Sequence, residues 1–240
     1  MKGVSMRNAG RSRSLIFSAI ALAVLSALAY LWLGGLSILA DSPTLADQQE
    51  TGFHYRIGAP DSLTVRIDVD YDTKTADGVL GYQKAVAARS AHYAEANTGR
   101  LIEVDVTFNK PLPMEQFNSF VEKYGLQPRD FVIRSIEPDG QRSTISGALT
   151  TGEGISQETI ERMLLANGGT VRGVVSFRAM LLGATYPQLS ADGNVFLVDA
   201  LEAELKDKAS TLRPNQDRAA IEYTPRSLYW SLEDLGLVQK

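Results

Sequence analysis

The chain has 240 residues, among them 24 basic and 28 acidic side chains, two histidines and no cysteine. The absence of cysteine excludes disulfides, thiolate nucleophiles, zinc ribbons and iron–sulfur ligation, and two histidines do not supply a histidine-rich metal site. Four basic residues and no acidic residue precede position 41, so the remainder carries 20 basic and 28 acidic residues, a net charge of −8. An acidic surface repels phosphate backbones, and we therefore expect no nucleic-acid partner.

A long uncharged segment dominates the N-terminal region. Residues 14–40 carry no formal charge, and about 20 apolar residues suffice for a helix to cross the ~30 Å hydrocarbon layer of a membrane. The run is longer than the apolar core of a signal peptide, which usually has ~7–15 residues. Ile38 also stands where a cleavage site after Ala40 needs a small side chain. The sequence predicts an uncleaved transmembrane helix over residues 15–38 in contact with the lipid bilayer, with a cleaved signal peptide as the alternative.

The flanks of this segment predict its orientation and the division of the chain. Positive charge before a span stays on the cytoplasmic side, so we expect residues 1–14 to form a cytoplasmic tail of a single-pass cell-membrane protein. Residues 39–63 are polar and contain prolines and glycines, which indicates a linker. We expect an extracytoplasmic domain over residues 64–203, and a polar linker with a C-terminal amphipathic helix over residues 204–240.

The patterns after the linker alternate between strand and helix. Strict apolar–polar alternation, clearest in "LIEVDVTF", is typical of half-buried strands. Apolar residues at spacings of three and four, with a proline at the start or a glycine at the end, indicate helices. In chain order we predict a strand at 64–71, a helix at 79–97, a strand at 101–108, a helix from Pro113 to Gly125, strands at 131–137 and 143–149 joined by a turn, a helix capped by Ser156, a strand at 170–180, a short helix within 181–190 and a strand at 194–200.

Two topologies fit these elements. In the first, a β-α-β-β-α-β unit closes within residues 101–178. In the second, residues 143–167 are an insertion, and residues 170–200 supply the second half of the unit. Both give an α+β fold with one ferredoxin-like, open and mainly antiparallel sheet that has its helices packed on one face.

The segment "VRGVVSFRAMLLGATYPQLSADGNVFLVDAL" carries a resemblance to a known family. It contains Gly173 and Val174 in a strand, Leu189 in a short helix and the strand Val195–Asp199. About residues 170–200 thereby resemble the subtilisin propeptide and peptidase inhibitor family. The resemblance implies a strand-rich surface that docks on a partner, and so a protease inhibitor or a propeptide-like chaperone.

The first predicted strand carries acidic residues at alternate positions. Asp68, Asp70 and Asp72 could place three carboxylates on one face and bind calcium. An EF-hand loop that begins at Asp68 would need glycine and glutamate where Thr73 and Val79 stand, so that motif is absent. We favour the solvated face of an edge strand, where charges discourage aggregation, and keep calcium as the alternative.

The sequence contains no recognisable catalytic motif. It has no G-x-S-x-G elbow, no Walker A loop and no G-x-G-x-x-G loop between a strand and a helix. Its acidic residues lie in turns or on alternating strand faces, and no pattern marks an acid–base pair. We therefore predict a protein that is not an enzyme and that needs no cofactor or metal. The alternative, an envelope hydrolase, predicts a deep pocket lined by carboxylates with perturbed pKa values.

An apolar stripe lies near the C-terminus, within residues 223–237. Tryptophan and tyrosine are favoured anchors in protein interfaces, so the predicted partner-binding residues are Leu228, Tyr229, Trp230, Leu232 and Leu235. The alternative is that this helix packs onto its own sheet. The interpretation that we favour is a membrane-anchored extracytoplasmic domain for protein binding or scaffolding, as a subunit of a bacterial envelope assembly.

Overall fold

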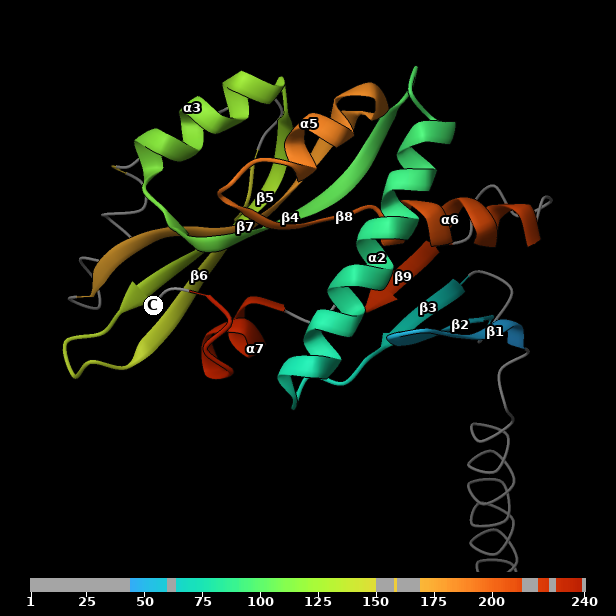
Figure 1. Ribbon diagram of the computed structural model, residues 1–240, viewed down its shortest axis with the longest axis horizontal. Helices are drawn as coiled ribbons and strands as arrows, with labels where there is room; N and C mark the ends of the chain where they lie inside the picture. Colours follow the sequence, from blue (N-terminus) through green and yellow to red (C-terminus); the bar gives the residue numbers. More distant parts are fainter. Residues whose placement is uncertain are drawn as a thin grey trace, which may run out of the picture. The chain divides into compact units, whose positions relative to one another are not determined.

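The computed structural model describes residues 44–59, 64–149, 158, 169–212, 220–224 and 228–238 (Figure 1). The predicted transmembrane segment 15–38 lies outside these ranges, as does the helix predicted after Ser156, apart from the single residue Glu158. No helix in the described ranges has the length and apolar character needed to cross a membrane.

The described chain is α+β, as predicted, but it forms two sheets rather than one. The first sheet has the order β1-β2-β3-β9, and the second has the order β6-β5-β7-β4-β8. Every pair is antiparallel except β3 and β9, which run parallel. The strands are β1 (Thr44–Glu50), β2 (Phe53–Gly58), β3 (Thr64–Asp70), β4 (Leu101–Leu112), β5 (Gln127–Ile136), β6 (Arg142–Ala148), β7 (Thr170–Leu182), β8 (Val195–Asp199) and β9 (Ala220–Thr224).

The helices begin and end at residues whose chemistry suits a terminus. Thr75 caps α2 by accepting a hydrogen bond from the Gly78 N–H. Gly125 ends α3 with a φ of 60°, a left-handed conformation that glycine adopts without steric cost. The helices are α2 (Ala76–Ala96), α3 (Met114–Tyr124), the 3-10 turn η1 (Gly183–Thr185), α5 (Tyr186–Ser190), α6 (Leu201–Leu212) and α7 (Leu228–Asp234).

The strand order decides between the two predicted topologies. Strand β7 pairs with both β4 and β5, while β6 pairs with β5 at the edge of the sheet. The β5–β6 hairpin turns at Gly140, whose φ is 84°. Strand β6 is therefore an addition at the edge, and β7, α5 and β8 supply the second half of the unit, as in the second topology.

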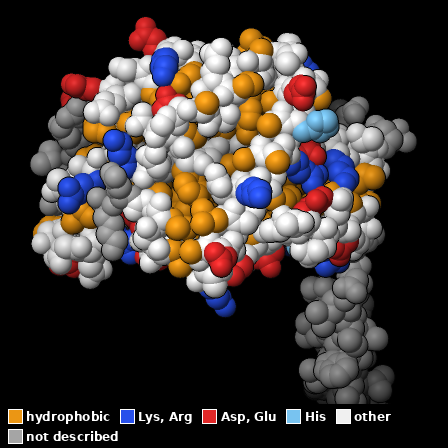
Figure 2. All heavy atoms as spheres, viewed as in Figure 1, with side chains coloured by type: hydrophobic (Ala, Val, Ile, Leu, Met, Phe, Trp, Pro, Cys, Tyr) orange, Lys and Arg blue, Asp and Glu red, His pale blue; other side chains and the backbone are white. Residues whose placement is uncertain are grey.

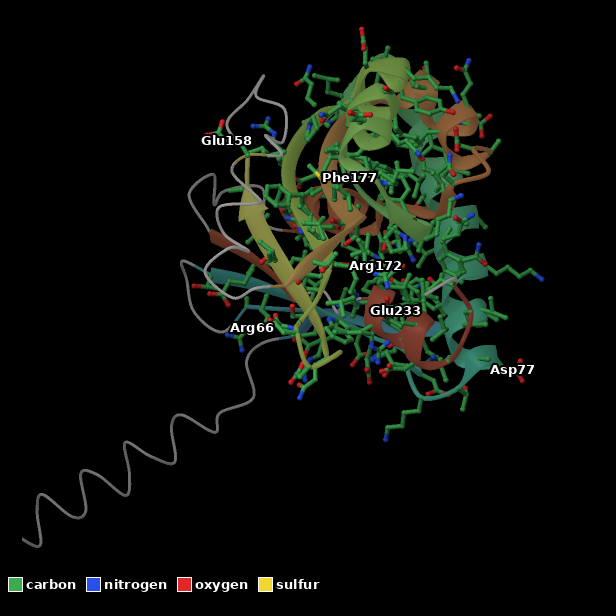
Figure 3. The ribbon with its side chains drawn as sticks, turned by 90° about the vertical axis from the view of Figure 1, so that its left-hand side faces the viewer. Arg66, Asp77, Glu158, Arg172, Phe177 and Glu233 are labelled. Carbon is green, nitrogen blue, oxygen red and sulfur yellow. The ribbon has the colours of Figure 1, made fainter. Side chains whose placement is uncertain are left out.

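Helices cover both faces of the second sheet, so the prediction that they lie on one face was wrong. On one side, α3 and α5 enclose a core that contains Phe108, Phe117 and Phe177. On the other side, the first sheet, α6 and α7 enclose a second core. Figure 3 shows Phe177 of β7 next to α3, and Glu233 on α7. Helix α2 contributes to both cores.

Two segments predicted as linkers form regular structure. Within 39–63, Phe53, Tyr55 and Ile57 alternate and are buried, so the segment folds as the hairpin β1–β2. The turn is at Gly52, where φ is 96°. Gly52 forms the turn of the hairpin and Gly58 ends β2, whereas the sequence pattern indicates that these glycines interrupt regular structure.

The second such segment is the linker that was predicted to begin at residue 204, and its first residues belong to α6 (Leu201–Leu212). Leu201, Leu205 and Ala209 lie four residues apart and are buried, which holds α6 against the second core. Strand β9 follows and joins the first sheet beside β3. The predicted domain boundary at residue 203 thus falls inside α6, and the C-terminal residues complete the first sheet.

Candidate functional site

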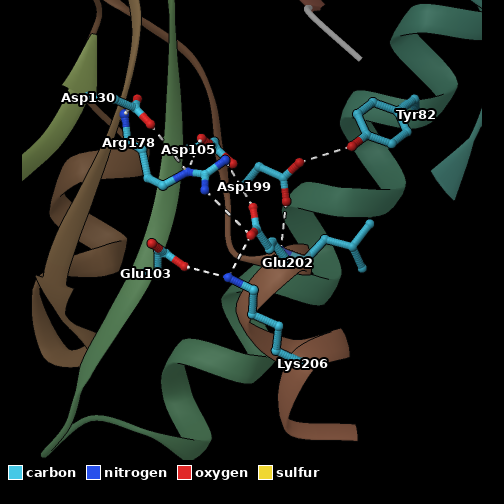
Figure 4. Close-up of polar contacts among 9 residues, drawn as sticks. Tyr82, Glu103, Asp105, Asp130, Arg178, Asp199, Glu202 and Lys206 are labelled. Carbon is cyan, nitrogen blue, oxygen red and sulfur yellow. Dashed lines mark hydrogen bonds and ion pairs between the residues drawn. The ribbon is translucent and has the colours of Figure 1, made fainter. Parts of the chain in front are cut away.

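A row of charged residues crosses four strands of the second sheet (Figure 4). Arg178 on β7 lies opposite Asp130 of β5 and opposite Asp105 of β4. Asp105 lies in turn opposite Asp199 of β8. Residues in register on neighbouring strands point to the same face of a sheet. The strand register therefore collects three carboxylates and one guanidinium on the face that looks toward the first sheet.

A cavity of about 490 Å³ lies between the two sheets. The row of Asp130, Arg178, Asp105 and Asp199 forms part of its wall. The remaining wall is partly hydroxylic and aromatic, and includes Thr107, Ser146, Ser176, Val69, Leu197, Leu228, Tyr71, Tyr82 and Tyr223. The cavity therefore combines charged groups on the second sheet with tyrosine rings from β9, from α2 and from the residue that follows β3.

Arg178 is surrounded by carboxylates. Its Nε lies 3.3 Å from Asp105 Oδ1 and 3.8 Å from Asp130 Oδ2, and its Nη2 lies 3.1 Å from Glu202 Oε2. Its backbone N–H also donates to Asp130 Oδ1. Burial alone would lower the pKa of Arg178, but the carboxylates of Asp105, Glu202 and Asp130 raise it above its ordinary value.

A second cation lies next to this network on α6. Lys206 Nζ is 2.6 Å from Glu202 Oε1 and 3.1 Å from Glu103 Oε2. Burial lowers the pKa of Lys206, and the neighbouring Glu202 and Glu103 raise it to a net value above the ordinary one. Glu202 thus bridges Arg178 and Lys206, so the positive charge of Lys206 is already matched outside the four-residue row.

Burial raises the pKa of Asp105 to about 7. Arg178 opposes this shift, while Asp199 and Glu202 add to it by repulsion. The side chain keeps 37% of its accessible area because it faces the cavity. The surrounding protein nevertheless removes it from bulk water, so its carboxyl group changes protonation near neutral pH.

Burial also raises the pKa of Asp199, to about 6, although two hydrogen bonds oppose the shift. The Leu201 N–H donates to Asp199 Oδ1, and the Tyr82 hydroxyl donates to Asp199 Oδ2 at 2.9 Å. Repulsion from Glu202 and Glu204 contributes to the increase. Two neighbouring carboxyl groups of the cavity therefore titrate between about pH 6 and 7.

Three tyrosines form another part of the wall. The rings of Tyr71 and Tyr82 stack with centroids 3.8 Å apart and an interplanar angle of 16°. Burial, followed by repulsion from Asp199, raises the pKa of Tyr82 and of Tyr223 well above the ordinary value. Both phenols therefore stay protonated at neutral pH and present neutral rings.

A different polar cluster fixes α7 on the same face of the second sheet. Arg134 of β5 donates two hydrogen bonds to Glu233, from Nε to Oε1 at 3.1 Å and from Nη2 to Oε2 at 2.5 Å. Both side chains are buried, with 1% and 2% of their area exposed. The Arg134 guanidinium also lies 3.9 Å from the centroid of the Trp230 ring, and Arg142 lies 5.3 Å from it.

This cluster explains where the predicted partner-binding residues lie. Leu228, Tyr229 and Leu232 are buried in the second core, and Leu235 packs against it. Trp230 is half-buried between two arginines of the same domain. The structure thus places the helix on its own sheet, which was the alternative, and the predicted stripe does not form an exposed patch.

The three aspartates of the first predicted strand do not converge. Asp68 and Asp70 are exposed on β3, opposite Arg56 and His54 of β2. Asp72 accepts hydrogen bonds from the Lys74 N–H and the Thr75 hydroxyl at the start of α2. Across the described residues, no group of three or more histidine, cysteine, aspartate or glutamate side chains has an arrangement that could hold a metal ion.

Figure 2 shows one face of the molecule, on which basic and acidic side chains are interspersed and hydrophobic side chains gather near the centre.

A scan against protein-family models, a search of curated proteins and a search of solved structures found no significant match. The resemblance to subtilisin propeptides therefore stays a prediction.

Proposed function

We propose that the chain is a single-pass, membrane-anchored extracytoplasmic binding domain of the bacterial envelope, and that the cavity between its two sheets holds the ligand. The observation that carries this proposal is the cavity of about 490 Å³ with a row of charged side chains in its wall. Small-molecule sites typically have volumes of about 300–1,000 Å³ and a few convergent polar groups. The anchor rests on the predicted span over residues 15–38.

The fold is compatible with this proposal but does not select it. Without β6, the second sheet has the order β8-β4-β7-β5, with the first and third strands of the β-α-β-β-α-β unit at its centre. We take this unit to be ferredoxin-like, with the β5–β6 hairpin added at one edge. Folds of this kind host many unrelated functions, so the proposal depends on the cavity itself.

Binding through a bare sheet face has less support. Such a face is what the propeptide-like alternative requires, but within the described residues α3 and α5 cover one side of the second sheet, and the first sheet and α7 cover the other. The predicted C-terminal stripe is also largely buried. We therefore propose the cavity as the primary binding site. A protein partner in an envelope assembly would bind elsewhere, on the outer surface of the domain.

A hydrolase is the second candidate, and one observation favours it. Asp105 and Asp199 lie opposite each other on β4 and β8, and their pKa values are raised to about 7 and about 6. Because both pKa values lie well above the usual 3.8, the pair can hold and release a proton near neutral pH, which acid–base catalysis requires. The hydrolase proposal predicts turnover that Asp105→Asn abolishes while ligand binding persists.

The binding proposal is tested by filling the cavity. The full-length chain, held in lipid nanodiscs, is heated with and without a small-molecule extract of its native cells. We expect the extract to raise the melting temperature of the wild type and of Thr144→Phe, an exposed position on β6, but not of Ser176→Phe, whose ring occupies the cavity. An equal rise in Ser176→Phe would contradict the proposal.

A further inference from the structure

The charges in the cavity wall are unbalanced. Asp105, Asp130 and Asp199 contribute three carboxylates, and Arg178 contributes one guanidinium (Figure 4). Arg178 also contacts Glu202 at 3.1 Å, so its charge is shared among more carboxylates than it can neutralise. An anionic ligand would meet a guanidinium that is already paired and would be repelled by the remaining carboxylates. A cationic ligand would instead relieve the excess negative charge.

The neighbouring cation does not correct this imbalance. Lys206 is within 3.1 Å of both Glu202 and Glu103, which take up its charge on the α6 side of the network. Among the residues described, the carboxylates also do not form a group that could hold a metal ion. The charge that is missing from the cavity is therefore better supplied by an organic group than by a metal.

The aromatic part of the wall suits the same kind of ligand. Tyr71, Tyr82 and Tyr223 line the same cavity as the charged row, and the Tyr82 hydroxyl contacts Asp199. Aromatic faces attract cations through their quadrupole, and the attraction is strongest where water is excluded. Carboxylates and aromatic rings in one cavity form the combination that recognises an ammonium group attached to an apolar body.

We propose that the cavity binds an organic cation, with its ammonium group beside Asp105 and Asp199 and its apolar body against the tyrosine rings. This inference rests on the proposed function, because it names the ligand class of the same cavity. The Tyr82 hydroxyl donates to Asp199 Oδ2 and thereby fixes the orientation of that carboxylate. Tyr82 is a positioning residue as well as part of the wall.

Cation binding at this site is coupled to proton release. The groups that face Asp105 and Asp199 are Arg178 on β7, Asp130 on β5, Glu202 and Glu204 on α6, Tyr82 on α2 and Tyr223 on β9. A bound cation favours the ionised carboxylates, and their pKa values of about 7 and about 6 lie above the usual value of 3.8. The affinity for the cation therefore rises as the pH increases from 5.5 to 8.

Three compounds of similar shape and different charge test the inference: phenethylamine, phenethyl alcohol and phenylacetate. Binding to the full-length chain in lipid nanodiscs is measured by calorimetry at pH 8. We expect phenethylamine to bind at least tenfold more tightly than the other two, and its affinity to fall at least fivefold at pH 5.5, where it remains protonated. Asp105→Asn reduces the affinity for phenethylamine tenfold, whereas Asp68→Asn, on the exposed face of β3, leaves it unchanged.

The outcomes separate this inference from the proposed function. If phenethyl alcohol or phenylacetate binds as tightly as phenethylamine, and Ser176→Phe prevents that binding, the cavity is a binding site but does not select cations. If no compound binds while the cell extract still stabilises the wild type and not Ser176→Phe, the cation inference alone fails. If Ser176→Phe changes neither measurement, both proposals fail. If circular dichroism shows that Asp105→Asn is unfolded, Asp130→Asn replaces it in the binding measurement, because it removes a negative charge from the same row.

Discussion

Two polar clusters lie on the same face of the second sheet, and they differ in how their charges are matched. Under α7, Arg134 is paired with Glu233 through two hydrogen bonds, and the Trp230 ring fills the space beside the guanidinium. Toward the other end of the strands, Arg178 is surrounded by Asp105, Asp130 and Glu202 next to a cavity. Asp130 and Arg134 lie four residues apart on β5 and therefore point to the same face of the sheet, so neighbouring parts of one strand contribute to both clusters.

The difference indicates which cluster stabilises the fold and which is available to a ligand. A buried ion pair that is fully hydrogen-bonded and enclosed by side chains leaves no unmet interaction. An excess of carboxylates in a cavity wall has an electrostatic cost, and burial together with this repulsion raises the pKa values of Asp105 and Asp199. The first cluster therefore fixes α7, and the second is the better candidate for recognition.

The largest effect is expected from Glu233→Ala in the cluster under α7. The substitution leaves the buried Arg134 guanidinium without its carboxylate, which typically destabilises a protein by about 3–5 kcal/mol. The free energy of unfolding, measured by urea denaturation of the full-length chain, should fall by that amount. Asp234→Ala removes a more exposed partner of Arg142 and should lower the free energy by less than about 1 kcal/mol.

A double variant sharpens this first test. Arg134→Met with Glu233→Leu replaces both charges by apolar side chains of similar volume, and such replacements are often neutral. We expect the double variant to recover most of the stability lost in Glu233→Ala. If it is as unstable as the single variant, the pair does more than match two buried charges, and the distinction between the clusters weakens.

A smaller effect is expected from Trp230→Ala, which also tests the predicted partner-binding stripe. The ring stacks with the Arg134 guanidinium and packs between two arginines, so its loss should lower the free energy of unfolding by about 2 kcal/mol. Trp230→Phe should retain about half of this contribution. If Trp230→Ala instead leaves stability unchanged and abolishes capture of a protein from native membranes, α7 is an interface after all.

Tyr82→Phe tests the cavity cluster with an effect of about 1 kcal/mol, the usual net contribution of one hydrogen bond. The variant removes the hydroxyl that donates to Asp199 Oδ2. Because this hydrogen bond lowers the pKa of Asp199, the pKa should rise above its value of about 6. Carbon-detected NMR titration of the aspartate carboxyl groups measures the shift. Tyr93→Phe, which removes an exposed hydrogen bond to Asp207, should leave the Asp199 titration unchanged.

The second sheet could be predicted from the sequence because its signals are local. Alternation in "LIEVDVTF" and the spacing of apolar residues before Gly125 correctly predict β4 and α3. The hairpin β1–β2 was missed because its glycines, which form a turn and a strand end, also suit a linker. Helix α6 was missed because its charged surface outweighs the few residues, spaced by four, that it buries.

The candidate site could not be predicted because its residues meet through strand register and layer packing. The alternation that predicts β4 also places Asp105 on a polar face, and such a face usually meets solvent. Here the first sheet covers that face, and no local pattern shows that a second layer exists. In the same way, Arg134 and Glu233 are 99 positions apart. The sequence near Trp230 therefore does not indicate that the Trp230 ring packs against an arginine of the same domain.

The smallest effect, and the one that most directly separates the clusters, is the pH dependence of Asp105→Asn. The pKa of Asp105 is about 7 in the folded protein against a usual value of 3.8, so between these values the folded state binds more protons than the unfolded state. Stability from this group is therefore gained as the pH falls from 8 to 5, and Asp199 contributes with the same sign.

Asp105→Asn removes the group that responds to pH and should be slightly more stable than the wild type at pH 8. Lowering the pH to 5 should remove this advantage. The relative change in melting temperature should be only about 1–2 °C, because the Asp105 side chain is more than a third exposed and solvent screening reduces the effect of its charge. Asp68→Asn, on the exposed face of β3, controls for the loss of one negative charge. If Asp105→Asn is instead destabilised most strongly at pH 8, the Asp105 carboxylate is a matched structural charge like Glu233, and it is not available to balance a cation in the cavity.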